Sequence, residues 1–162
     1  MKNLDTKKQI KVFKILLILI WMIVIFMFSN EKGAKSTSTS RKVTEAIVQT
    51  VSSKSIEENE PIIVSLDKVI RKLAHYTIYT IGGIVIFNYA KTTEKSKKEK
   101  ILYSIAFGAC YAITDEIHQF FVSGRSARIF DVGIDTLGVI TGILIYLAII
   151  KIIETTKLKI QE

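Results

Sequence analysis

The sequence has few of the residues that cross-link or interrupt a folded chain. Its 162 residues include one Cys, one Pro and two His. A lone cysteine excludes an intramolecular disulfide and the paired-cysteine metal sites of small domains. One proline leaves few hard breaks, which favours long helices over many short elements. We interpret the cysteine, Cys110, as a small core residue.

Acidic residues are also scarce beside basic ones: 15 against 23, a formal net charge of +8. Nucleic-acid binding needs basic residues on one folded face. Here 13 of the 19 lysines fall instead into three short segments, 1–14, 91–100 and 151–162, and the seven basic residues of 29–71 are largely offset by six acidic ones. Cytoplasmic loops of membrane proteins carry such an excess. The charge therefore predicts membrane topology, with both termini cytoplasmic, and no nucleic-acid partner.

Four hydrophobic runs account for most of the apolar residues: 12–28, 73–89, 101–121 and 130–150. A helix rises ~1.5 Å per residue, so runs of this length span roughly the ~30 Å hydrocarbon core of a bilayer. We predict an all-α integral membrane protein, one domain over 1–162 with four transmembrane helices. The first run is also open to interpretation as a signal peptide. Its length and the absence of a small-residue cleavage site favour a retained span.

The outer segment, 29–71, precedes the second span. Its start, "SNEKGAKSTSTS", is polar and Ser-rich, which indicates a loop. Val43, Ile47 and Val51 then recur at helical spacing. After Pro61 the apolar residues keep that spacing, so we predict one helix over 62–89. Its amphipathic first part is expected to rest on the membrane surface.

Polar side chains gather where this topology brings three helix ends together, in the outer leaflet. Ionisable groups at bilayer depth cost ~2.5–3.5 kcal/mol each, which makes them functional candidates by default. The competing interpretation is a structural network that ties helix ends together. The candidates from the second span, the third span, the short connection and the fourth span are Arg71, Lys72, His75, Asp115, Glu116, His118, Gln119, Arg125, Arg128, Asp131 and Asp135.

Their chemistry suggests distinct roles. Carboxylates and imidazoles suit proton transfer, so the catalytic candidates are Asp115, Glu116, His118 and His75. Cations, amides and further carboxylates suit ligand binding; these are Arg71, Lys72, Gln119, Arg125, Asp131 and Asp135. We expect no cofactor. The alternative is a divalent metal held by His75, His118 and Asp115.

The same residues carry a resemblance to a known family. "FSN", "RKLAHYTIYTIGG" and "YAITDEIHQFFVSGRSARIFDVGIDTLGVITG" resemble the VanZ-like family pattern. That pattern is RK-x-x-H at a helix entry, DE-x-HQ, a G-R loop and D-x-x-x-D-x-x-G opening the last helix. The match covers the spans and not the Ser-rich segment. Family members often have Gln where Asn30 stands.

The resemblance implies a multi-pass protein of the bacterial cell membrane with a role in the cell envelope. The founding member is linked to lowered susceptibility to teicoplanin-type glycopeptides. The expected partners are the lipid bilayer and an envelope lipid or lipid-linked wall precursor. An enzyme and a non-catalytic binder both stay open, as does the oligomeric state. A transporter is less favoured, since four short spans leave little room for alternating access.

Overall fold

The computed structural model describes residues 2–31, 33–52 and 55–161. Its secondary structure in this part of the chain is entirely helical. The five helices are α1 (Lys2–Ser29), α2 (Gly33–Val51), α3 (Glu60–Ala90), α4 (Lys97–Phe120) and α5 (Ile129–Gln161). The prediction of one helix over 62–89 is confirmed, with Pro61 in its first turn, where a missing N–H costs nothing.

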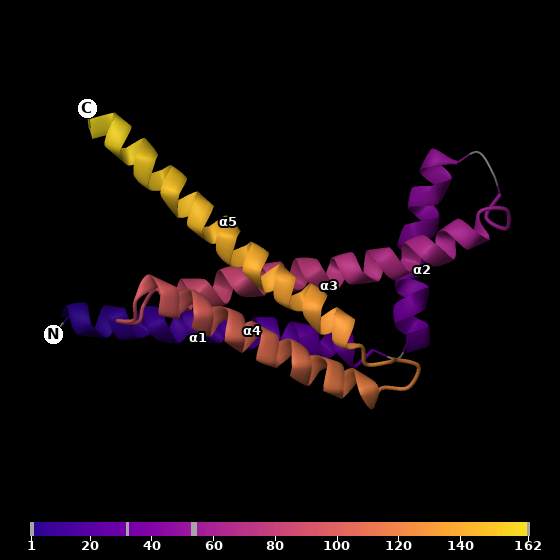
Figure 1. The fold of residues 1–162 in the computed structure, drawn as a ribbon, viewed down its shortest axis with the longest axis horizontal. Helices are drawn as coiled ribbons and strands as arrows, with labels where there is room; N and C mark the ends of the chain where they lie inside the picture. Colours follow the sequence, from indigo (N-terminus) through magenta and orange to yellow (C-terminus); the bar gives the residue numbers. More distant parts are fainter. Residues whose placement is uncertain (1, 32, 53–54, 162) are drawn as a thin grey trace.

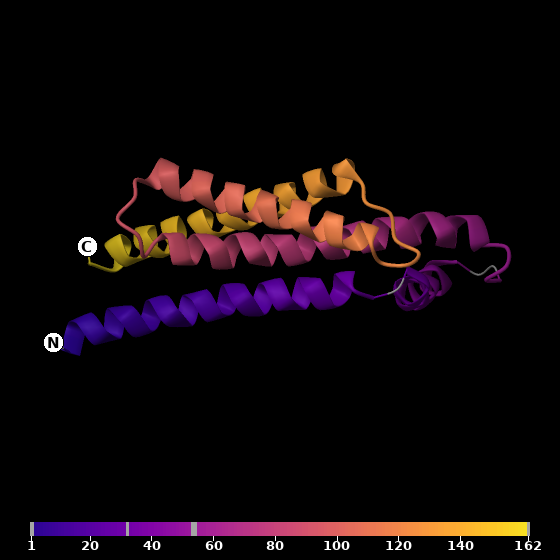
Figure 2. The ribbon, with the colours of Figure 1, turned by 90° about the horizontal axis from the view of Figure 1, so that it is seen from below.

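Four helices run mainly along the molecule, and α2 lies across one end of them (Figures 1 and 2). Both termini and the α3–α4 connection lie at the other end. The three lysine-rich segments therefore share one end. The α1–α2 and α4–α5 connections share the end that carries α2.

Glycines let α5 cross α3 at close range. A Cβ atom added to Gly138 would lie 2.6 Å from the carbonyl oxygen of Tyr76, and one on Gly142 would overlap the carbonyl of Thr80. Gly83 on α3 meets the backbone of α5 in the same way. Such backbone contact is what small residues permit between membrane helices.

Helix α1 is attached to this pair through aromatic side chains. Trp21 packs over Gly82, and its indole N–H donates to the carbonyl of Ile78 at 2.8 Å. The hydroxyl of Tyr111 on α4 donates to the carbonyl of Met22 at 2.6 Å. These bonds fix α1 against α3 and α4 while most of its surface remains exposed.

The loop predicted for the Ser-rich segment is wrong, because α2 begins at Gly33. Tertiary contacts outweigh the modest helix propensity of Ser and Thr there. Arg41 binds Glu45 on its own helix and both carboxylate oxygens of Glu60 on α3, at 2.9 and 2.6 Å. The hydrogen bonds from Arg41 lower the pKa of Glu60. This helix does include the predicted stripe, and the stripe is exposed.

The core position predicted for Cys110 is also wrong: its side chain is exposed. Gly108 and Ala112 form the buried face of α4 at that level. Cys110 falls midway between them, about 200° around the helix at 100° per residue, so it points away from the bundle.

Two helical segments are long and apolar enough to cross a membrane, Asp5–Ser29 and Ile129–Ile160. Their apolar side chains are largely exposed; Met27 and Leu144 are 67% and 60% accessible. Exposed apolar surface of this extent marks an interaction with lipid or protein. The described part of the chain is thus all-helical and includes two candidate membrane spans.

Candidate functional site

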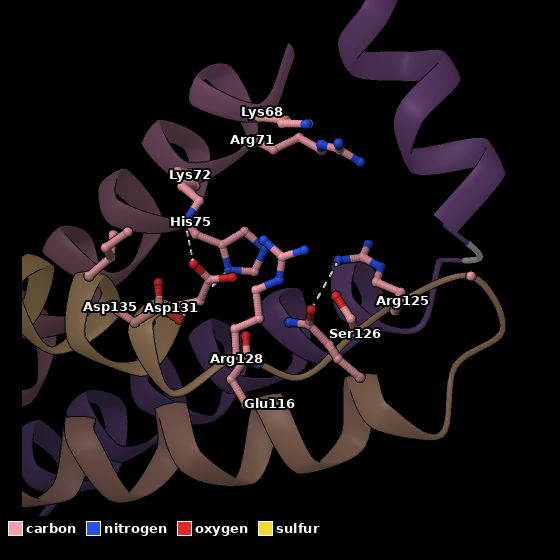
Figure 3. A pocket seen from close by; sticks show the side chains of 13 residues that line it. Lys68, Arg71, Lys72, His75, Glu116, Arg125, Ser126, Arg128, Asp131 and Asp135 are labelled. Carbon is pink, nitrogen blue, oxygen red and sulfur yellow. Dashed lines mark hydrogen bonds and ion pairs between the residues drawn. The ribbon is translucent and has the colours of Figure 1, made fainter. Parts of the chain in front are cut away.

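A cavity of about 260 Å³, here called the polar cavity, opens at the end that carries α2 (Figure 3). Basic side chains reach toward it from α3 and from the α4–α5 connection. It is lined by Lys68, Arg71, Lys72, His75, Glu116, Gln119, Gly124, Arg125, Ser126, Arg128, Asp131, Ile134 and Asp135. Five of these residues are Lys or Arg and three are Asp or Glu, so the lining favours an anion.

Ion pairs occupy the α3 side of the rim. Lys72 Nζ lies 2.7 Å from Asp131 Oδ1, which joins α3 to the first turn of α5. The Arg71 guanidinium lies 3.1 Å from Asp67 and donates to the Thr37 hydroxyl of α2 at 2.9 Å. These contacts link three helices around the cavity mouth.

The floor of the cavity holds buried carboxylates beside an imidazole. Asp135 is 1% exposed, and neither of its oxygens has a hydrogen-bond partner among the described residues. Its Oδ2 lies 3.8 Å from His75 Nδ1. Asp115 is buried close by and accepts a hydrogen bond from Gln119 at 2.9 Å. Two acidic groups therefore face a single histidine.

Arg125 acts as a clasp between helix ends. Its three guanidinium nitrogens donate to the carbonyls of Glu31 and Phe28, at 3.2 and 2.9 Å, and to Gln119 Oε1 at 3.3 Å. The carbonyl of Phe28 lies at the C-terminus of α1, where backbone acceptors lack helical partners. Burial lowers the pKa of Arg125. Much of its donor capacity is already used within the protein.

Glu116 has a comparable structural contact. Its Oε2 accepts from the backbone N–H of Arg128 at 2.7 Å, just before α5 begins. The carboxylate thus anchors the α4–α5 connection on α4. The Arg128 guanidinium has no hydrogen-bond or ion-pair partner within the described ranges and points into the cavity.

His118 does not line the polar cavity. Its ring stacks on Phe26 of α1 with centroids 4.6 Å apart, and its Nδ1 is buried without a partner in the part of the chain that is described. The cavity is thus lined by every candidate from the sequence except His118 and Asp115, and a ligand atom of Asp115 lies within 4.8 Å of those of His75 and Asp135. The described group that could hold a metal ion consists of His75, Asp115 and Asp135, so Asp135 takes the place for which the sequence suggested His118.

A second cavity, the apolar cavity, adjoins the first. Its volume is about 310 Å³, and it lies between α1, α2 and α3. The two cavities share three lining residues, Arg71, His75 and Arg125. The remainder of the lining is mainly apolar: Ile25, Phe28, Glu31, Ser40, Val43, Ile70, Ala74 and Ile78.

Comparison with family models identifies the chain. Residues 13–151 match the model of the VanZ/LLP1 family. The chain belongs to the VanZ/LLP1 family. Every residue of the polar cavity falls within the matched stretch. Searches of curated proteins and of solved structures found no match. The resemblance of the motifs to the VanZ-like family is therefore confirmed. Membership of this family, together with the two long apolar helices, indicates that the protein associates with a membrane.

Two polar residues that line the cavity of this VanZ/LLP1 protein, Lys68 and Ser126, were not predicted from the sequence. Lys68 lies one helical turn before Lys72 and seven residues before His75, so its spacing on α3 offered a signal. Ser126 lies in the connection, and no spacing pattern pointed to it. Tyr79 shares a face with His75, and its buried hydroxyl has no partner among the described residues.

Proposed function

We propose that the protein spans the bacterial cell membrane four times, with both termini in the cytoplasm. The lysine-rich ends support this topology, since Lys and Arg accumulate on the cytoplasmic side. On this topology the polar cavity opens in the outer leaflet. Helix α2, crosswise at that end with Val43, Ile47 and Val51 exposed, would lie in the membrane surface.

Cysteine labelling tests this topology. In a Cys110→Ser background, Ser38→Cys on α2 should react with an impermeant thiol reagent in intact cells, and Glu94→Cys should react only after lysis. Both positions are exposed. Within the α3–α4 connection, Glu94 is chosen because the nearby Ser96 caps α4: its side chain accepts a hydrogen bond from the N–H of Glu99. The reverse pattern would place the cavity in the cytoplasmic leaflet.

The ligand that fits the two cavities is an amphiphile with an anionic head. The observation that carries this proposal is their adjacency: a cationic polar cavity and an apolar cavity share Arg71, His75 and Arg125. A headgroup phosphate would accept charge-assisted hydrogen bonds in the first, and an acyl or isoprenyl chain would fill the second. Envelope lipids and lipid-linked wall precursors have this build.

The cations differ in how free they are to bind such a head. Arg125 and Lys72 are engaged with protein acceptors. Lys68 and Arg128 have no side-chain partner among the residues described, and both line the polar cavity. We therefore assign capture of the phosphate mainly to these two, with Arg71 at the junction of both cavities.

Removing both free cations should abolish most of this binding. Lys68→Gln with Arg128→Gln is expected to weaken binding of a polyisoprenyl phosphate at least tenfold. A hydrogen bond to a charged group contributes about 1.5–3 kcal/mol, and ~1.4 kcal/mol is tenfold. The measurement is native mass spectrometry of the detergent-solubilised protein with increasing lipid, with phosphatidylcholine as the zwitterionic reference.

The matched control removes the same charge from the other end of the bundle. Lys97→Gln with Lys98→Gln, in the exposed first turn of α4, should bind the lipid as the wild type does. Equal losses in both double variants would mean that binding follows net charge alone, which would refute the assignment. If the protein lowers teicoplanin susceptibility, cells that express Lys68→Gln with Arg128→Gln should be susceptible again. Cells that express Lys97→Gln with Lys98→Gln should not.

The second candidate function is catalysis on the same anionic headgroup. The observation that favours it is the buried, unpartnered carboxylate of Asp135 beside His75. Such a pair can exchange protons with a bound group. Of the catalytic candidates from the sequence, His75 and Asp115 lie on this floor, whereas Glu116 is bonded to the backbone.

A further inference from the structure

Three groups that suit a metal ion lie together at the floor of the polar cavity: His75 and Asp135 line it, and Asp115 is buried beside them. One ligand atom from each of His75, Asp115 and Asp135 lies within 4.8 Å of the others. Ligand atoms at ~2.0–2.2 Å from a tetrahedral ion lie about 3.3–3.6 Å apart, so side-chain rotations that bring these atoms roughly 1 Å closer would close the set. The three residues come from three helices, α3, α4 and α5.

The state of Asp135 is a second, independent observation that points to a cation. The carboxylate is 1% exposed, and both oxygens lack hydrogen-bond partners among the residues described. A buried carboxylate is costly unless it is paired, protonated or bound to a metal. With Asp115 also buried nearby, one histidine cannot neutralise both carboxylates.

We propose that His75, Asp115 and Asp135 bind one divalent transition-metal ion, Zn²⁺ or Mn²⁺. One imidazole with two carboxylates is a mixed donor set that these ions accept. Gln119 donates to Asp115 at 2.9 Å and so orients that ligand from behind. Three protein ligands leave an open position. If the proposed headgroup binding holds, a phosphate oxygen can fill this position; metal binding itself does not require it.

Direct metal analysis tests this site. The full-length protein, purified without a histidine tag and stripped with a chelator, is titrated with Zn²⁺ and separately with Mn²⁺. Bound metal is counted by mass spectrometry after gel filtration. The wild type should retain about one ion per chain, and Asp135→Asn and His75→Gln should weaken binding more than tenfold. Even outer partners of metal ligands cost ~10–100-fold.

His118→Gln is the matched control, because that histidine stacks on Phe26 outside the cavity. It should bind metal as the wild type does. Thermal denaturation of the wild type gives a readout that needs no variant, since an ion bound only to the folded state raises its melting temperature. The proposal fails if the stripped wild type takes up no ion, gains no thermal stability, or binds no more than Asp135→Asn. A proton shared between Asp115 and Asp135 would then explain how two buried carboxyl groups lie beside one histidine. Headgroup binding by Lys68 and Arg128 is measured separately and would survive this failure.

Discussion

Gly142→Leu should prevent α5 from packing on α3. Any Cβ at this position overlaps the carbonyl of Thr80, a backbone atom that cannot rotate away. The helices must therefore separate along the crossing, which also carries Gly138 and Gly83. Overpacking a well-filled core costs ~1–3 kcal/mol, and a whole leucine belongs at the upper end or above. We expect loss of monodisperse protein in gel filtration of solubilised membranes.

Gly133→Leu is the control on the same helix. A Cβ at Gly133 meets nothing within 4 Å, and the position is exposed. This variant should accumulate and elute as the wild type does. Equal loss in both variants would trace the damage to glycine replacement in α5 itself and not to the crossing. Because α3 and α5 both supply cavity residues, separation should also remove headgroup and metal binding together.

The sequence predicted the helical architecture well because its signals are local. Apolar runs, lysine-rich segments and the proline in the first turn of α3 are each local signals that depend on neighbouring residues alone. The convergence of Arg71, Asp115 and Asp131 at one end followed from alternating helix direction. The helical stripe of Val43, Ile47 and Val51 in α2 was predicted, but the helical state of its Ser-rich first part was not; the distant pairing of Arg41 with Glu60 supports that part.

The direction of each site residue was harder to predict. Taking Asp115 as zero, Gln119 lies about 40° and Glu116 about 100° around α4, at 100° per residue. His118 lies about 60° in the other direction. Glu116 and Gln119 line the cavity, Asp115 is buried and bonded to Gln119, and the histidine packs against Phe26. The spacing of these residues predicts which part of the α4 surface is polar. Only the packing of α1 determines which side of that polar surface faces the cavity.

The use of Arg125 was hidden for a related reason. Its partners include two backbone carbonyls at the end of α1, nearly a hundred residues earlier in the chain. No side-chain pattern reports where a helix leaves its last carbonyls. From the sequence, Arg125 was therefore predicted to bind a ligand, and Arg128, three residues later, was only a member of the same polar set. In the structure one holds helix ends together and the other faces the cavity.

This difference predicts opposite behaviour for two identical substitutions. Arg125→Lys should lower the melting temperature of the solubilised protein, and Arg128→Lys should leave it unchanged. One ammonium cannot replace three separate donors, and a buried acceptor left unpaired, here Gln119 Oε1, costs ~1–3 kcal/mol. At ~2–4 °C per kcal/mol for a chain of this size, the melting temperature should fall by roughly 2–12 °C.

Lipid binding should also distinguish the variants of Arg125 from those of Arg128. Arg128→Gln should weaken binding of polyisoprenyl phosphate at an unchanged melting temperature, because its guanidinium stabilises no described part of the protein. Arg125→Lys, measured well below its melting temperature, should retain much of the binding, because Lys68 and Arg128 remain. If Arg125→Lys is as stable as the wild type but loses the lipid, Arg125 is the anion ligand that the sequence suggested. The clasp would then contribute little to the fold, and the phosphate would lie on the α1 side of the cavity, against Phe28 and Glu31.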